Sequence, residues 1–77
     1  MLKAFVLIET ATGTSPRVVS LLKATPEVRS VDRVTGPHDI IVVIEVSDLA
    51  ALGTWLEDNA RSLPGVQKTV TCVAMSQ

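Results

Sequence analysis

The sequence contains few of the residues from which enzymes, metal sites and disulfide scaffolds are built. Its 77 residues include one cysteine, Cys72, one histidine, His38, two aromatic side chains and no tyrosine. A single cysteine cannot form an internal disulfide, and a zinc site requires further cysteine or histidine ligands. These shortages fit a reducing compartment and a protein without a metal or other cofactor.

Charged residues are also few and of both signs. Seven Lys and Arg stand against eight Asp and Glu, and the basic residues are scattered along the chain. Because phosphate recognition needs several cations on one face, direct nucleic-acid binding is not expected. The longest apolar run, residues 40–44, is too short to cross a bilayer, and the N-terminus lacks a signal-peptide pattern. We therefore expect a cytoplasmic protein without a membrane partner.

Apolar residues, in contrast, make up 47% of the chain, which excludes disorder and leaves the core to Val, Leu, Ile and Ala. A chain of 77 residues forms one domain with one core. A domain of this size buries only about 60% of the surface that its unfolded chain exposes. Because the apolar surface exceeds what one small core absorbs, we expect another molecule to cover the remainder.

Four segments have the composition of β-strands. Residues 2–9 (LKAFVLIE) are apolar on both alternating sets, which predicts a central strand covered on both faces. Residues 28–35 carry the charges of an edge strand, and residues 40–46 (IIVVIEV) predict the most buried strand, paired with it as a hairpin across a Gly-Pro turn. Residues 66–75 alternate as the last strand, with Thr69 and Thr71 on one side and Cys72 on the other, packed as a small buried hydrophobe.

Two segments have helical patterns. Residues 16–24 follow Ser15, a predicted N-cap with proline at the first helical position. A second helix is expected from residue 48 or 49 to residue 62, capped by Ser47 or Asp48, with Trp55 beside its inner stripe. The predicted inner stripes are Val18, Leu21, Leu22 and Thr25 in the first helix, and Leu49, Leu52, Leu56, Ala60 and Leu63 in the second.

The resulting order, βαββαβ, predicts a ferredoxin-like α+β fold, in which a four-stranded antiparallel sheet carries both helices on one face. The other sheet face is then bare. Because the strands at residues 2–9 and 40–46 are apolar on both sets, this face exposes a larger patch than monomers tolerate. We therefore expect at least a homodimer, packed sheet to sheet as a dimeric α+β barrel.

Several short motifs occur in a characteristic order. Thr-Gly-Pro-His-Asp-Ile-Ile at residues 35–41 is followed, one helix later, by Leu-Pro-Gly-Val at residues 63–66 and by Thr69 and Thr71, and Pro-Glu-Val at residues 26–28 leads into the second strand. Over residues 4–75 this order resembles the effector-binding domain of the Lrp/AsnC (leucine-responsive and asparagine-linked) regulators. Those regulators carry an N-terminal helix-turn-helix, whereas Met1 here begins directly on the first strand. The resemblance implies one stand-alone Lrp/AsnC-like ligand-binding domain, residues 1–77, without a DNA-reading helix.

The resemblance also implies a regulatory, non-enzymatic function. Dimers form through the open sheet faces and gather into a larger ring, and a small effector, commonly an amino acid, binds where dimers meet. A full-length Lrp/AsnC regulator is then a candidate partner, through which the chain would modulate transcription.

The positions that match the effector site are Gly36, His38 and Asp39 in one loop and Thr69 and Thr71 on the last strand. A zwitterion needs an acceptor for its ammonium group, which Asp39 can supply. Its carboxylate needs donors, such as backbone N–H groups near Gly36 and His38 or the two hydroxyls. Gly36 allows close approach of a ligand to the main chain.

Each of these residues also has a plainer interpretation. Asp39 can close the hairpin turn, His38 can be a solvated loop side chain, and the two threonines can be ordinary strand residues. An enzyme of the monooxygenase or muconolactone isomerase type, with His38 as acid or base, is an alternative on the same scaffold. A third alternative is an ACT-type amino-acid-binding module, whose site would lie in the loop of residues 12–15.

Overall fold

The computed structural model describes residues 1–75 and confirms the βαββαβ order. All neighbouring strands are antiparallel, and the sheet order is β2-β3-β1-β4. The strand at residues 2–10 is therefore central, and the second strand lies at an edge, as predicted. The elements are β1 (Leu2–Thr10), α1 (Ser15–Lys23), β2 (Val28–Arg33), β3 (Ile40–Val46), α2 (Leu49–Asn59) and β4 (Val66–Val73).

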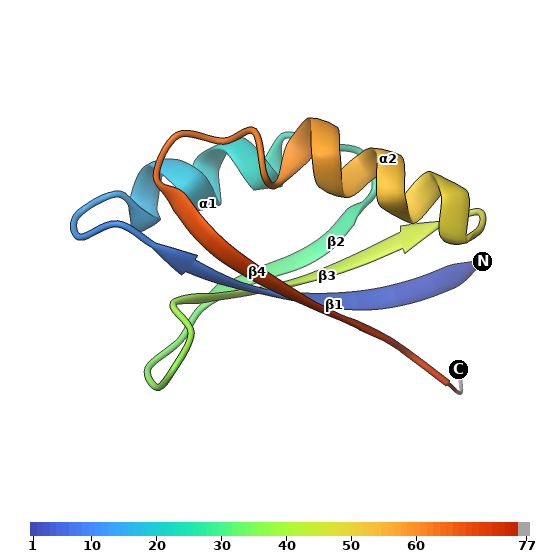
Figure 1. Cartoon of the computed structure of the whole chain (residues 1–77), viewed down its shortest axis with the longest axis horizontal. Coiled ribbons are helices and arrows are strands. Elements are labelled where there is room, and N and C mark those ends of the chain that lie inside the picture. Colours follow the sequence, from blue (N-terminus) through green and yellow to red (C-terminus); the bar gives the residue numbers. More distant parts are fainter. Residues whose placement is uncertain (76–77) are drawn as a thin grey trace.

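Both helices cover the same face of the sheet, and the loop between β2 and β3 extends toward the other side (Figure 1). One alternating set of each central strand is fully buried beneath the helices, while the other set is only half-buried. The core consists of Ala4, Val6 and Ile8 of β1, Ile40, Val42, Ile44 and Val46 of β3, Val18 and Leu22 of α1, and Leu52, Trp55, Leu56 and Ala60 at α2.

The two central strands are held in register along their whole length, from Leu2 opposite Val46 to Ile8 opposite Ile40. A slip by one residue would move each buried set to the other face, so the complete burial of one set fixes this register. Each fully buried Val or Ile side chain contributes about 1.5–3 kcal/mol of transfer free energy. The sheet is thus ordered mainly by its helix-facing side.

The start of α1 differs from the prediction. Ser15 is the first helical residue, and the N-cap is Thr14, whose side chain makes no capping hydrogen bond. The Thr14 hydroxyl donates instead to the Ala11 carbonyl oxygen at 2.7 Å, and the Ser15 and Thr10 hydroxyls lie 2.7 Å apart. Leu21 of the predicted inner stripe is 36% exposed, because a helix of nine residues presents only Val18 and Leu22 fully to the sheet.

The second helix has the predicted cap but a different inner face. Asp48 is the N-cap, and its Oδ1 accepts a hydrogen bond from the Ala51 amide at 2.8 Å. Leu49 is 65% exposed and Trp55 only 3% exposed, so the inner stripe runs through Trp55 and not through Leu49. The helix ends at Asn59, three residues before the predicted residue 62, and Leu63 packs against the core from the loop.

Strand ends also shift by a few residues. β2 ends at Arg33 and β4 at Val73, two residues earlier than predicted, and β1 extends to Thr10. The alternation along β4 is as predicted, because Thr69 and Thr71 pair with the buried Ile8 and Val6. Cys72, however, is exposed. It pairs with Phe5 on the sheet face that carries no helix, so the prediction of a buried cysteine is wrong for the single chain.

The loop between β1 and α1 packs against the loop between α2 and β4. The Ala11 amide donates to the Gly65 carbonyl oxygen at 2.8 Å, and Gly65 has a φ of +95°, in the left-handed region that favours glycine. A Cβ atom at Gly65 would lie 2.6 Å from Oγ1 of Thr14. Since that hydroxyl is already bound to Ala11, the contact has little room to relax.

We predict that Gly65→Ala lowers the free energy of unfolding by about 2–4 kcal/mol, from the positive φ and the overpacking together. Gly53→Ala is the matched control, because Gly53 lies inside α2 with nothing within 4 Å of an added Cβ. It should raise stability by up to about 1 kcal/mol through helix propensity. Urea denaturation at one protein concentration measures both, and equal midpoints for the two variants would contradict the described loop packing.

Candidate functional site

Asp39 fastens the β2–β3 loop to the end of the central strand. Its Oδ2 accepts a hydrogen bond from the Thr10 amide at 2.8 Å and lies 3.4 Å from the Thr10 hydroxyl. Its own amide donates to the Ile8 carbonyl oxygen at 2.9 Å, and its carbonyl accepts from the Val34 amide at 2.9 Å. The plainer interpretation, a turn-closing carboxylate, is therefore correct for one oxygen. Oδ1 makes no hydrogen bond with residues 1–75.

His38 lies beside Glu9 at the same end of the sheet. Its Nδ1 is 3.9 Å from Oε2 of Glu9, too long for a hydrogen bond. The same Nδ1 is buried and has no hydrogen-bond partner among the described residues. A buried polar atom without a partner is uncommon in folded proteins, so this nitrogen requires a water molecule or another group as its partner.

Glu9 is a member of this cluster that the sequence analysis did not assign to the site. The pairing of Ile8 with Ile40 places the next residues, Glu9 and Asp39, opposite each other at the strand ends. Two carboxylates and one imidazole therefore gather at the C-terminal end of β1. In the sequence, Glu9 is conspicuous only as the acidic residue that follows the apolar run of residues 2–8. Its position opposite Asp39 follows from the strand register and not from the sequence.

Gly36 lies in the loop above this cluster, with a φ of +124°. No atom lies within 4 Å of the position that its Cβ would occupy. The glycine is thus required by the backbone conformation, and the space beside it is open, which leaves the main chain accessible to a ligand.

Thr69 and Thr71 do not join the loop residues within one chain. Both pair with helix-facing residues of β1, whereas Glu9 lies on the set that faces away from the helices. β4 and β3 flank β1 on opposite sides, so Thr69 and Ile40 are separated by about 10 Å across the sheet. A hollow of about 380 Å³ borders Thr69, with Arg61 and residues 66–68, but it includes no residue of the β2–β3 loop.

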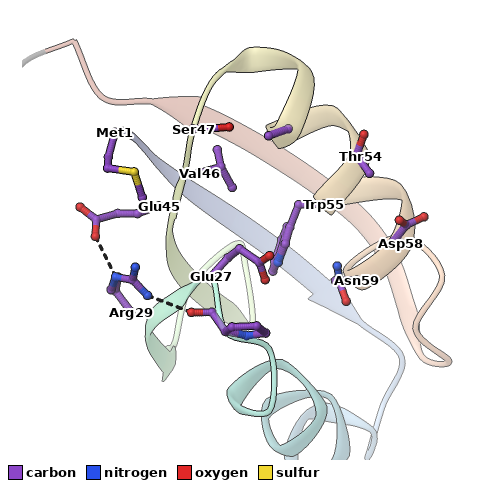
Figure 2. A pocket seen from close by; sticks show the side chains of 12 residues that line it. Met1, Glu27, Arg29, Glu45, Val46, Ser47, Thr54, Trp55, Asp58 and Asn59 are labelled. Carbon is purple, nitrogen blue, oxygen red and sulfur yellow. Dashed lines mark hydrogen bonds and ion pairs between the residues drawn. The ribbon is translucent and has the colours of Figure 1, made fainter.

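A larger hollow, of about 530 Å³, lies at the opposite end of the sheet (Figure 2). It is bordered by one edge of α2, the connection from α1 to β2 and the last residues of β3. The Arg29 guanidinium binds Glu45 at 2.7 Å on one wall. None of the predicted site residues contributes to this hollow.

These features define what the molecule can hold. Within residues 1–75 no group of three or more His, Cys, Asp or Glu side chains is placed to bind a metal ion. The longest helix described has 11 residues, and no helix in that part of the chain is long and apolar enough to span a membrane. The protein is a one-sided ferredoxin-like domain with a cluster of polar side chains at the end of its central strand.

The family model of the Lrp/AsnC ligand binding domain matches residues 3–77. The chain therefore belongs to the Lrp/AsnC family. The HTH-type transcriptional regulator FL11 of Pyrococcus horikoshii is 33% identical over 72 residues, which are 94% of this chain and 47% of the regulator. The chain thus spans about half the length of the curated relatives it matches. Because these relatives are named as transcriptional regulators, the family is a regulatory one.

Solved structures agree with this assignment. The crystal structure of FFRP-DM1 is similar with a TM-score of 0.94 at 36% identity, over 97% of this chain and all of that chain. A transcriptional regulator of Neisseria meningitidis, solved as a complex with L-Met, has the same fold, with a TM-score of 0.89 at 23% identity over 99% of this chain and 51% of that chain. The predicted fold and family are confirmed.

We predict that Asp39→Ala lowers the free energy of unfolding by about 1–2 kcal/mol, because the partly buried Thr10 amide loses its acceptor. Asp39→Asn keeps an amide oxygen for this bond and should lose less than half as much. Thermal denaturation of the two variants measures the difference. If both have the wild-type midpoint, the loop is not held by this carboxylate.

Proposed function

We propose that the chain is a non-enzymatic sensor of an amino acid or similar small metabolite, which binds at the Gly36–Asp39 end of the sheet between copies of the chain. The observation that carries the proposal is the state of Asp39. One of its oxygens is fixed by Thr10, and the other makes no hydrogen bond with the described residues. A carboxylate held in this way is preorganised to receive a cationic group.

The neighbouring groups suit a zwitterion. Asp39 and Glu9 supply two carboxylates for an α-ammonium group. His38, whose Nδ1 has no partner among residues 1–75, and the open main chain at Gly36 can donate to an α-carboxylate. An amino acid satisfies both requirements at once, whereas a simple amine or a simple acid satisfies one.

Thr69 and Thr71 enter the site only from a second copy. Within one chain they lie on β4, beyond β1, and on the other sheet face from Glu9. Both are half-buried residues of β4, an edge strand that another dimer can approach. The five predicted ligand residues are therefore compatible with a site completed by neighbouring subunits.

The open sheet face supports the homo-oligomer. Phe5 and Leu7 of β1, Ile41 and Val43 of β3 and Val70 of β4 lie on this face, away from both helices. Such a contiguous apolar surface marks an interaction site in a protein of this size. A twofold packing of two copies through this face would cover it and produce the dimeric barrel, and further contacts between dimers would produce a ring.

The regulatory mechanism is a population shift. A ligand that binds at a contact between dimers stabilises the assembly that completes its site, by RT ln(1 + [L]/Kd). The same surfaces would let the chain join a full-length regulator of the family and so modulate transcription without binding DNA itself.

A substitution on the open sheet face tests the proposed homo-oligomer. Val43→Lys places an ammonium group opposite Phe5 at the centre of this face, and we expect the molar mass from light scattering to fall to that of one chain. Ser20→Lys on the exposed side of α1 is the matched control and should leave the mass unchanged. A wild-type monomer, or a Val43→Lys variant of wild-type mass, would refute assembly through this surface.

The effector is tested with the twenty amino acids. One of them, at about one hundred times its Kd, should raise the free energy of unfolding by about 2.7 kcal/mol. Asp39→Asn should abolish this gain, while Glu57→Gln, on the outer side of α2, should retain it. If the gain survives in Asp39→Asn at full size, the site lies elsewhere, and if no amino acid has an effect, amino-acid sensing is refuted.

A further inference from the structure

The hollow of about 530 Å³ lies at the other end of β3 from Asp39. Residues 45 and 46 border it, whereas Asp39 precedes the first residue of the strand. On α2, Ala51, Thr54 and Asp58 succeed one another at the helical repeat along its edge. The hollow is thus a separate feature that the proposed effector site does not use.

Its walls have an excess of negative charge. The residues that line it carry three carboxylates, on Glu27, Glu45 and Asp58, and two cationic groups, the Arg29 guanidinium and the N-terminal ammonium of Met1. Arg29 binds Glu45 through Nε at 2.7 Å and donates from Nη1 to the Pro26 carbonyl oxygen at 2.9 Å. The carboxylates of Glu27 and Asp58 have no ion pair or hydrogen bond within residues 1–75. Two carboxylates without a partner among the described residues therefore belong to the lining of the hollow.

Trp55 supplies an independent sign of a ligand. Its side chain is 3% exposed, and its indole Nε1 is buried without a hydrogen-bond partner among the described residues. Buried indole N–H groups usually find an acceptor. Figure 2 shows the ring within the group of side chains that lines the hollow, with its nitrogen toward the end where Glu27 and Asn59 lie. An acceptor atom at that end would satisfy it.

We propose that this hollow binds a small organic cation that also carries an acceptor oxygen, of the amino alcohol class. The ammonium group would bind the Glu27 and Asp58 carboxylates, and the hydroxyl oxygen would accept the bond from Trp55. The carbon chain would lie on the apolar surface of Val46 and the indole ring, where a cation is further attracted to the π face. An anionic ligand is disfavoured by the unpaired carboxylates.

The single tryptophan makes this testable, because all indole emission comes from within the proposed site. We expect 4-amino-1-butanol to change the Trp55 fluorescence saturably in the intact chain. Butylammonium, which lacks the acceptor oxygen, should bind about tenfold more weakly, and 1,4-butanediol, which lacks the charge, should bind more weakly still. Butyrate should give no saturable change.

Variants separate the site from a general charge effect. Glu27→Gln and Asp58→Asn should each weaken 4-amino-1-butanol about tenfold. Glu57→Gln, the neighbouring carboxylate on the outer side of α2, removes the same charge and should bind like the wild type. Trp55→Phe, measured by calorimetry, should bring 4-amino-1-butanol close to the affinity of butylammonium.

Three results would overturn the proposal. The first is the absence of a saturable change with 4-amino-1-butanol, and the second is an equal response to butylammonium and 1,4-butanediol. The third is an equal loss of affinity for 4-amino-1-butanol in Glu57→Gln and Asp58→Asn. The outcome is independent of the amino-acid sensor, because Asp39→Asn leaves the hollow intact. That variant should bind 4-amino-1-butanol normally even where it has lost its effector.

Discussion

The structure depends on the position of β1 between β3 and β4. This strand makes both sets of central ladder hydrogen bonds, and its helix-facing residues Ala4, Val6 and Ile8 are fully buried. Its C-terminal end receives Asp39 through the Thr10 amide and carries Glu9 opposite that residue. The same strand thus organises the core and brings together the carboxylates of the candidate effector site.

A four-stranded sheet with two short helices can be covered on one face only. The side of β1 and β3 away from the helices therefore keeps half-buried apolar residues, with Lys3 lying over the Phe5 ring at 5.4 Å. This arrangement explains why both alternating sets of these strands are apolar in sequence. One set builds the core of the single chain, and the other supplies the surface through which copies are proposed to associate.

Strand periodicity and the order of elements could be read from the sequence because a period of two repeats over seven or more residues. The inner side of α2 could not be predicted from the sequence, because Leu49 and Trp55 both fit an apolar helical pattern. Only the packing shows that Trp55 is buried and Leu49 is exposed. For the candidate site, the loop with Asp39 is implied by the resemblance of its motifs to the family, but the approach of Glu9 and His38 depends on strand register. The larger hollow could not be predicted from the sequence, because its residues come from four separate segments.

The two candidate sites occupy opposite ends of β3, and this separation limits how they can interact. Seven residue steps from Asp39 to Val46 span about 23 Å of extended strand, well beyond the screening length of about 8 Å at physiological ionic strength. A charge bound at one end therefore has little direct effect on the other. Coupling between them must pass through packing, either along β3, which is buried on alternate residues throughout, or through contacts between copies. If the effector and the amino alcohol both bind, each can change the affinity for the other. Loss of that cooperativity in the monomeric Val43→Lys variant would show that the coupling passes through contacts between copies and not through the sheet.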